Sequence, residues 1–338
     1  CAACSQSLPK DEFSKKQWQL KHQRRCKECI TVNREVNKNL DAPNDAPASS
    51  CTNDEGTSVQ LLKGLLLQTL SCAVSEGETA SSFTDDDLFK QCEPNEECPV
   101  CFVTLPTKIS MIQYQVCCGK MLCIGCIYAA FTADDRRLCP FCRTPYYTSD
   151  EEYVKRIKKR VEGNDAMAMR TLGCHYDDGS MGLPQNLEKA MKLFLRAGEL
   201  GCTIAYSNIG NAYKDGHGVE RDTKKAKYYW ELAAMGGDVI SRHNLGNFEG
   251  HSGKMDRAVK HFMIAAGAGY DGCLKNIRAC FMAGYATKDD FEKALRAHKE
   301  AKDEMKSDQR EAAAKFLRNQ RGTNSDGVYV GESRVQSL

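Results

Sequence analysis

Eight cysteines between residues 98 and 142 carry the clearest chemistry in this sequence. They occur as four pairs, namely Cys98 and Cys101, Cys117 and Cys118, Cys123 and Cys126, and Cys139 and Cys142. In three of these pairs two residues separate the cysteines, which lets a tight turn direct both thiolates at one metal ion. Zinc favours four ligands in a tetrahedron, so the four pairs supply two complete sites. We therefore expect two zinc ions and a reducing compartment, because disulfides would consume the thiols.

The order of these pairs resembles the all-cysteine variety of RING finger. Fifteen, four and twelve residues separate the successive pairs, which fits that family. In RING fingers the first and third pairs hold one zinc ion, and the second and fourth pairs hold the other. The resemblance therefore implies one site of Cys98, Cys101, Cys123 and Cys126, and a second site of Cys117, Cys118, Cys139 and Cys142.

The sequence departs from the usual RING pattern at the third and fourth ligands. Cys117 and Cys118 are adjacent, whereas at least one residue usually separates these two ligands. No histidine lies between Cys98 and Cys142, so Cys118 is the candidate for the ligand that is usually a histidine. A module of about 50 residues has little core of its own, and metal binding should therefore provide much of its folding free energy.

The RING resemblance also implies a binding site, because RING fingers bind a ubiquitin-conjugating enzyme in a shallow apolar groove between the zinc loops. The positions that correspond to this docking site are Val100, Ile127, Phe131, Pro140 and Arg143. Ala130 falls where the central helix, about residues 125–131, usually presents a bulky contact. Arg143 directly follows the last ligand, and its guanidinium group can donate to the enzyme and to ubiquitin at once.

The implied reaction needs no nucleophile from this protein. A RING finger holds the charged conjugating enzyme so that its thioester to ubiquitin takes a reactive geometry, and orientation of this kind lowers the barrier. None of the seven cysteines outside the predicted zinc pairs has an obvious base beside it. The leading hypothesis is thus a ubiquitin-protein transferase without a covalent intermediate. In the alternative, Val100, Pro140 and Phe141 only pack the zinc loops, and the protein is a non-enzymatic adaptor that assembles a complex.

A second pattern begins near residue 162, where small residues recur at fixed intervals. Ala190, Ala226, Ala258 and Ala294 are separated by 36, 32 and 36 residues, and Gly173, Gly210 and Gly246 keep the same rhythm. Each unit has the pattern of two helices joined by a glycine-containing loop, and only stacked units can bury the apolar faces. The sequence therefore predicts an all-α solenoid, with a surface for a protein substrate or partner complex.

These units resemble Sel-like repeats (SLR), which are short relatives of tetratricopeptide repeats. Leu172-Gly173-x2-Tyr176 and Ile209-Gly210-x2-Tyr213 match the opening of that repeat, and Gly216-x-Gly218-Val219 matches its loop. The third unit has lost four loop residues, and the fourth carries Arg278 where glycine is expected. A last polar helix, roughly Asp289–Asn319, is expected to cover the end of the solenoid.

Another four-cysteine set, near the start of the chain, predicts one more zinc ion. Its members are Cys1, Cys4, Cys26 and Cys29, with His22 as a substitute ligand. The segment resembles the first zinc finger of LIM-like adaptor domains. The basic run Lys21–Lys27 is expected to be a solvated surface, and nucleic-acid binding through it is a weaker alternative.

Composition divides the 338 residues into modules. The expected order is an N-terminal finger (1–38), an acidic and largely disordered linker (39–93), the RING finger (94–148), the helical repeats (149–305), and a polar helix with a loose tail (306–338). Residues 41–97 contain twelve acidic residues but only two basic ones, Lys63 and Lys90, and such one-sided charge disfavours a packed core. The predicted fold class is multidomain, with small zinc-stabilised α+β modules and an all-α solenoid.

Charge and hydropathy exclude the membrane class. The formal net charge is +2, and 27% of the residues are charged. No stretch approaches the roughly 18 apolar residues that a membrane span requires. With the clustered thiols, this composition leads us to expect a cytoplasmic or nuclear protein that binds ubiquitin, its conjugating enzyme and a protein substrate. The first residue is Cys1 rather than methionine, so the position of the natural N-terminus stays open.

Overall fold

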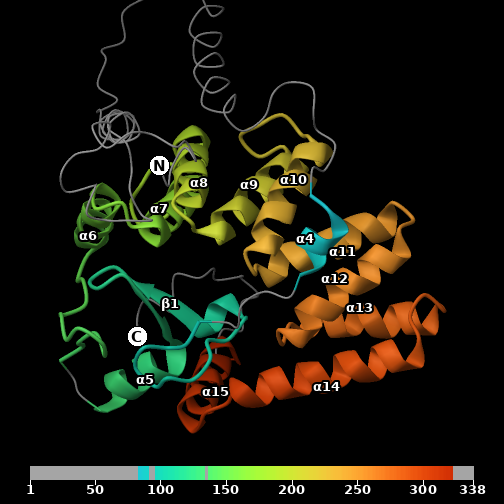
Figure 1. The fold of residues 1–338 in the computed structure, drawn as a ribbon. Helices are drawn as coiled ribbons and strands as arrows, with labels where there is room; N and C mark the ends of the chain where they lie inside the picture. Colours follow the sequence, from blue (N-terminus) through green and yellow to red (C-terminus); the bar gives the residue numbers. More distant parts are fainter. Residues whose placement is uncertain (1–82, 91–95, 134–135, 323–338) are drawn as a thin grey trace, which may run out of the picture. The chain divides into compact units, whose positions relative to one another are not determined.

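The structure is a computed structural model that describes residues 83–90, 96–133 and 136–322 (Figure 1). The predicted N-terminal finger, with Cys1, Cys4, Cys26, Cys29 and His22, lies outside the described residues, so its zinc site stays a prediction. The described part of the chain comprises a small cysteine module, between residues 96 and 147, and a series of helices that follow it. Among the described helices, none is both long enough and apolar enough to cross a membrane.

The cysteine module is built around one hairpin and one helix. A 3-10 turn, η3 (Ile109–Met111), leads into strand β1 (Ile112–Gln115), which pairs with the antiparallel strand β2 (Lys120–Cys123), and β2 continues into helix α5 (Ile124–Ala133). Ile112 lies opposite Cys123, and Gln115 lies opposite Lys120. The core is small: Leu122 and Ile124 are fully buried, and they pack among the cysteines themselves.

A helical solenoid follows the cysteine module. Its helices are α6 (Asp150–Glu162), α7 (Ala166–Asp178), α8 (Leu187–Glu199), α9 (Thr203–Asp215), α10 (Thr223–Met235), α11 (Val239–His251), α12 (Met255–Gly267), α13 (Asp271–Met282) and α14 (Lys288–Glu304). Side-chain oxygens cap the first turns of several helices; the capping residues include Asp165, Asn186, Asp222 and Asp238. Helices α7 and α8, α9 and α10, and α11 and α12 pack as close pairs, so the predicted repeat of two helices is confirmed.

The repeated glycines permit the closest contact within each pair. A Cβ atom at Gly210 would lie 2.5 Å from Cδ1 of Trp230, which is on the second helix of the same unit. Gly173 meets Phe194, and Gly246 meets Phe262, in the same way. An aromatic ring on the second helix thus lies directly on the backbone of the first helix, which explains why glycine recurs at this place.

Substitution of Gly210 by valine is expected to destabilise the solenoid by about 1–3 kcal/mol, because the new side chain would occupy the space of the Trp230 ring. Gly250→Ala is a matched control, since its Cβ would meet its nearest neighbours at 3.7 Å, an ordinary contact. That change should be neutral or stabilising, because alanine favours the helix over glycine. Urea unfolding followed by circular dichroism measures both. Equal midpoints for Gly210→Val and wild type would contradict the close packing.

The C-terminal helix differs from the prediction. In place of one polar helix over roughly Asp289–Asn319, the chain forms α14 and then α15 (Asp308–Gly322), with a break between them. The break follows from local chemistry, since the hydroxyl group of Ser307 accepts a hydrogen bond from the backbone N–H of Arg310 and starts a new helix. Helix α14 covers α12 and α13 as expected, but α15 returns to the cysteine module and packs against α5 (Figure 1).

A short helix, α4 (Asp85–Phe89), lies within the predicted linker. Thr84 and Asp87 form a capping box at its start, each side chain bonding to the backbone of the other residue. The end of the segment that was expected to be largely disordered is therefore ordered between residues 83 and 90, and its packing against α10 and α12 supplies the reason. The rest of the linker lies outside the described residues.

Candidate metal centre

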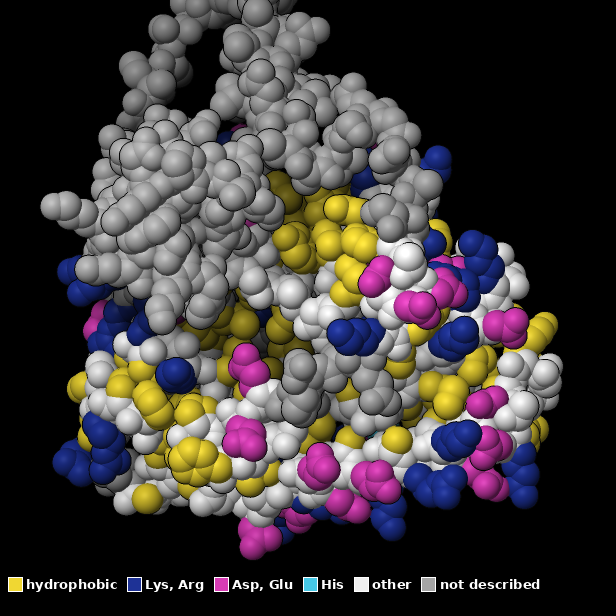
Figure 2. Space-filling view, viewed as in Figure 1, with side chains coloured by type: hydrophobic (Ala, Val, Ile, Leu, Met, Phe, Trp, Pro, Cys, Tyr) yellow, Lys and Arg dark blue, Asp and Glu magenta, His cyan; other side chains and the backbone are white. Residues whose placement is uncertain are grey.

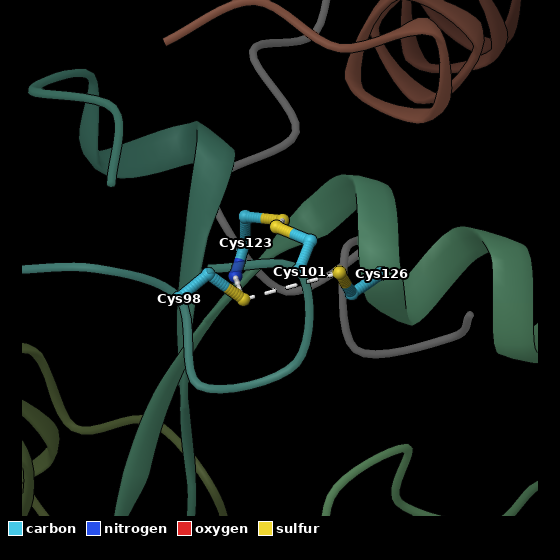
Figure 3. Close-up of side chains that lie close together, drawn as sticks. All are labelled: Cys98, Cys101, Cys123 and Cys126. Atoms are coloured by element: carbon cyan, nitrogen blue, oxygen red, sulfur yellow. Dashed lines mark hydrogen bonds between the residues drawn. The ribbon is translucent and has the colours of Figure 1, made fainter. Parts of the chain in front are cut away.

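The eight cysteines of the module gather in the two groups that the RING resemblance implies. One group is Cys98, Cys101, Cys123 and Cys126, and the other is Cys117, Cys118, Cys139 and Cys142. Within each group the four sulfur atoms all lie within 4.8 Å of one another. Figure 3 shows the first group, with the four side chains directed toward a common centre from a loop, the end of β2 and the start of α5.

Distances between sulfur atoms test whether zinc fits these groups. Four sulfur atoms about 2.3 Å from a central zinc ion form a tetrahedron whose edges are about 3.8 Å. In the first group, Cys98 lies 3.9 Å from Cys126, and Cys101 lies 3.8 Å from Cys123, sulfur to sulfur. In the second group, Cys117 lies 3.4 Å from Cys142, and Cys118 lies 3.9 Å from Cys139. Each group offers four thiols near tetrahedral spacing, and soft thiolate donors of this kind suit zinc. Both clusters could therefore hold a metal ion.

The second group shows how adjacent cysteines can share one metal. The turn between β1 and β2 contains Cys117, Cys118 and Gly119, and the backbone N–H groups of Cys118 and Gly119 both donate to the carbonyl oxygen of Gln115. Gly119 takes the left-handed conformation with φ of 70°, which closes the turn. Both thiols thereby reach the same cluster, where Cys118 lies 3.9 Å from Cys139. The hairpin turn thus allows the adjacent Cys117 and Cys118 to belong to one cluster.

The loops that carry the first and fourth pairs have the same backbone geometry. In the first cysteine loop (residues 98–103), Phe102 N–H donates to Cys98 O, and Cys98 N–H donates to Val103 O. In the second cysteine loop (residues 139–144), Arg143 N–H donates to the carbonyl oxygen of Cys139, whose N–H donates to Thr144 O. Phe102 and Arg143 both have positive φ, at 56° and 61°. Two equivalent turns thus present one cysteine pair to each cluster.

Thiol–thiol hydrogen bonds favour a thiolate in each cluster. Donation from the Cys117 thiol is the largest cause that lowers the pKa of Cys139, to about 5. Hydrogen bonding with Cys123 and then with Cys126 holds the pKa of Cys98 well below its usual range. The partners shift the other way, since hydrogen bonding to Cys139 raises the pKa of Cys117, and hydrogen bonding to Cys123 raises the pKa of Cys126. Metal binding to either cluster must therefore displace the protons that remain on its thiols.

The predicted docking residues lie in different environments. Val100, Phe131 and Pro140 are half-buried at the surface of the module, and Arg143 is exposed. Ile127 is only 3% exposed and belongs to the core, which differs from the expectation that it contacts a partner. It follows Ile124 by three residues and so shares the inward face of α5.

Two exposed aromatic side chains add to this surface. Phe102 is 74% exposed and Phe141 is 43% exposed, one on each cysteine loop. Phe102 was absent from the predicted set. The sequence could have indicated it, because Phe102 directly follows the second cysteine of its pair, as Arg143 does in the other loop.

The first helices of the solenoid hold the second cluster in place. Arg160 on α6 donates to the carbonyl oxygens of Val116 and Cys117, at 2.7 and 2.9 Å, and also pairs with Asp165. The hydroxyl of Tyr114 on β1 donates to Asp165 at 2.7 Å. Burial raises the pKa of Tyr114 above its usual value, so the hydroxyl keeps the proton that it donates. The hairpin is therefore fixed to the start of the solenoid through buried polar contacts.

The last helix holds the first cluster in a similar manner. Arg310 on α15 is 4% exposed and donates to the carbonyl oxygens of Thr104 and Val103, at 2.6 and 2.9 Å. A second contact joins the rings of Phe316 and Tyr128, whose centroids lie 5.2 Å apart. The cysteine module is thus bound to helices from both ends of the solenoid.

Comparison with known families supports the interpretation of the helices. Residues 166–202 and 203–238 each match the Sel1 repeat family. These residues are Sel1 repeats. A Sel1 repeat protein from Oxalobacter formigenes is a similar solved structure, with 27% identity and a TM-score of 0.40, covering 45% of this chain and 64% of that one.

Two plant proteins are similar in sequence over shorter stretches. The E3 ubiquitin-protein ligase DA2 of Arabidopsis thaliana is 32% identical over 84 residues, which is 24% of this chain and 20% of DA2. The ERAD-associated E3 ubiquitin-protein ligase component HRD3B, from the same plant, is 30% identical over 98 residues, which is 29% of this chain and 15% of HRD3B. The chain thus spans a fifth or less of the length of either relative.

Proposed function

We propose that this protein is a RING-type ubiquitin-protein ligase that binds two zinc ions and uses its Sel1 repeats to bind a substrate or partner. The interleaved cysteine clusters carry the proposal, because the first and third pairs meet in one cluster and the second and fourth pairs meet in the other. The similarity to DA2, which is named an E3 ubiquitin-protein ligase, supports it. Zinc bound in each cluster would hold the two cysteine loops in a fixed geometry.

The docking surface in this proposal lies on the two cysteine loops. Val100 and Phe102 lie on the first loop, and Pro140, Phe141 and Arg143 lie on the second. Exposed aromatic side chains and an exposed arginine are the residue types that dominate protein–protein binding. Phe131 on α5 borders this surface, with Ile127 in the core beneath. The conjugating enzyme would dock here, and Arg143 would donate to it and to ubiquitin.

In this mechanism, attachment of the cysteine module to the solenoid would let the repeats position a substrate. Arg160 and Arg310 fix the cysteine module to α6 and α15, so a substrate on the repeats would lie at a set distance from the bound thioester. Restricting the approach of a substrate lysine in this way raises its effective concentration at the thioester. The protein itself would supply no nucleophile.

A non-enzymatic adaptor is the second candidate. Two observations favour it: Ile127 is buried, and Ala313 of α15 packs into the same core, so α15 covers part of α5. The name of HRD3B, a ligase component, points the same way. In this alternative the zinc clusters and repeats would assemble a complex in which another subunit transfers ubiquitin.

Ubiquitin discharge from a panel of charged conjugating enzymes separates the two candidates. We expect the wild-type protein to stimulate discharge, and both Val100→Arg and Arg143→Ala to reduce the stimulated rate about tenfold or more, because central interface residues carry most of the binding energy. Lys120→Ala is the matched control, since Lys120 is exposed on strand β2 and belongs to neither cysteine loop. Each protein should retain two zinc ions in the cysteine module. No stimulation across the panel by protein with both clusters filled would support the adaptor instead.

A further inference from the structure

Helix α4 lies in a groove of the repeats as a ligand would. Leu88 is fully buried, and it packs against a cluster formed by Ala226, Trp230, Ala234 and Leu245 of α10 and α11. Phe83, just before the helix, stacks on Tyr228 with the ring centroids 5.8 Å apart. A five-residue helix is far too short to be stable alone, so the groove must supply the free energy that orders it.

Charged side chains of the repeats bind the two ends of α4. Arg242 on α11 is 1% exposed, and its guanidinium group donates to Leu88 O and, at 3.4 Å, to Lys90 O. The last carbonyl groups of a helix lack partners within the helix, so this arginine supplies the donors that they require. At the other end, Asp85 pairs with Arg257 of α12. The groove therefore recognises the backbone and charge of a short helix as well as its apolar face.

The phenyl ring of Phe89 lies among cationic and aromatic groups. The Arg257 guanidinium and the Lys260 ammonium each lie 5.2 Å from the ring centroid, and His261 lies 4.8 Å from it, ring to ring. Cations over an aromatic face are attracted by its negative quadrupole. Phe89 thus adds a second specific contact beside Leu88.

The groove is built to receive negative charge. Glu249, 1% exposed, pairs with Lys227 at 3.2 Å and with the Nε atom of Arg257 at 3.3 Å, and so orients Arg257, which also pairs with Asp85 of α4. Figure 2 shows acidic side chains gathered over α4, with Lys and Arg side chains on the helices around them. Glu249 offsets only part of this positive charge, because Arg242, Arg257 and Lys260 all contact α4. An acidic occupant therefore fits this place better than a neutral one.

We propose that this groove is a peptide-binding site for a partner protein that presents a short acidic helix ending in Leu-Phe, and that α4 occupies the site as a tethered competitor. The pattern Asp85-Asp86-Asp87-Leu88-Phe89 is a short motif of the helix-in-groove type, which a segment of another chain can reproduce. A partner with stronger contacts would displace α4 and take its place on α10, α11 and α12. The proposal concerns binding by the repeats and holds whether or not the protein transfers ubiquitin.

The test is binding of a fluorescent peptide, residues 83–90, to the full-length chain, followed by anisotropy. The wild-type chain should bind it weakly, because α4 competes from an effective concentration of about millimolar. A Leu88→Asp chain, whose own α4 no longer fits the groove, should bind the same peptide at least about tenfold more tightly. Phe89→Ala in the chain opens the groove by an independent change, and it should act in the same direction.

Peptide variants provide controls that cannot affect folding of the protein. A peptide with Leu88→Asp should lose about tenfold or more in affinity for the opened chain, because burial of this side chain provides much of the binding. A peptide with Asp86→Asn should bind as the wild-type peptide does, since Asp86 is exposed. The proposal is overturned if wild-type and Leu88→Asp chains bind the peptide with equal affinity, or if the Leu88→Asp peptide binds as well as the wild-type peptide. Neither measurement involves ubiquitin, so a failure here is separate from a failure of the ligase proposal.

Discussion

If the two clusters hold zinc as proposed, removal of the metal by a strong chelator is expected to unfold the cysteine module and leave the Sel1 repeats folded. The module has few fully buried apolar side chains besides its cysteines, among them Leu122 and Ile124. Structural zinc sites contribute about 10–16 kcal/mol of apparent binding free energy in zinc-finger peptides, which exceeds the roughly 3–5 kcal/mol that the apolar core of so small a module supplies. The repeats have their own core, with residues such as Leu193 and Ile209 buried to about 1% exposure or less.

Hydrogen exchange measured by mass spectrometry resolves the two outcomes. After chelation, peptides from residues 96–133 and 136–147 should exchange rapidly, while peptides from residues 166–238 should keep their protection. Cys126→Ser should give a similar loss in the first cluster without any chelator. Cys174→Ser is the matched control, because Cys174 lies on α7, outside both clusters. Unchanged protection of the module after complete zinc removal would contradict the assignment of a zinc-dependent fold.

The tight turns at the cysteines and the helices of the repeats could be predicted because both depend on local spacing. Two residues between cysteines dictate a tight turn, and the RING resemblance then implied which turns meet; the two clusters agree with that implication. The two-helix unit expected from the repeated small residues is present, for example as α9 and α10, which pack as a close pair. Glycines at a fixed interval indicated the close approach of helix pairs, as the contact of Gly210 with Trp230 shows.

The features that could not be predicted depend on contacts between distant residues. Arg310 reaches Thr104 across 206 positions, and Arg242 reaches Leu88 across 154. Neither contact leaves a pattern in the local sequence. The stretch around α4 is acidic and poor in apolar residues, so composition favoured disorder; Leu88 and Phe89 are enough to order it only because a groove is available. The burial of Ile127 could not be predicted either. Its position on α5 corresponds to a docking residue in the RING resemblance, but its side chain faces the core.

Arg310→Ala is expected to release α15 from the cysteine module. The substitution removes the Arg310 donor from the carbonyl oxygens of Thr104, Val103 and Met305, of which Val103 still accepts from the N–H of Cys98. Hydrogen bonds from a charged donor are worth about 1.5–3 kcal/mol each, and buried acceptors that lose them pay a desolvation penalty. The free energy that holds α15 in place should therefore fall by about 3 kcal/mol or more, which is enough to make undocking frequent.

Hydrogen exchange of residues 308–319 reports this release directly, because docking of α15 protects its amides. Arg318→Ala is the matched control: Arg318 lies on the same helix but is exposed, so protection should not change. A second route to the same state is Gly125→Val, since a Cβ atom at Gly125 would lie 2.8 Å from the backbone nitrogen of Arg310. If both variants keep α15 protected, the helix is held by the contact of Phe316 with Tyr128 and the burial of Ala313.

If both release it while the two clusters retain zinc, ubiquitin discharge by the released proteins then measures how far α15 limits access to α5. A rate above that of the wild type would show that this helix restrains the docking surface, and a lower rate would show that it supports that surface.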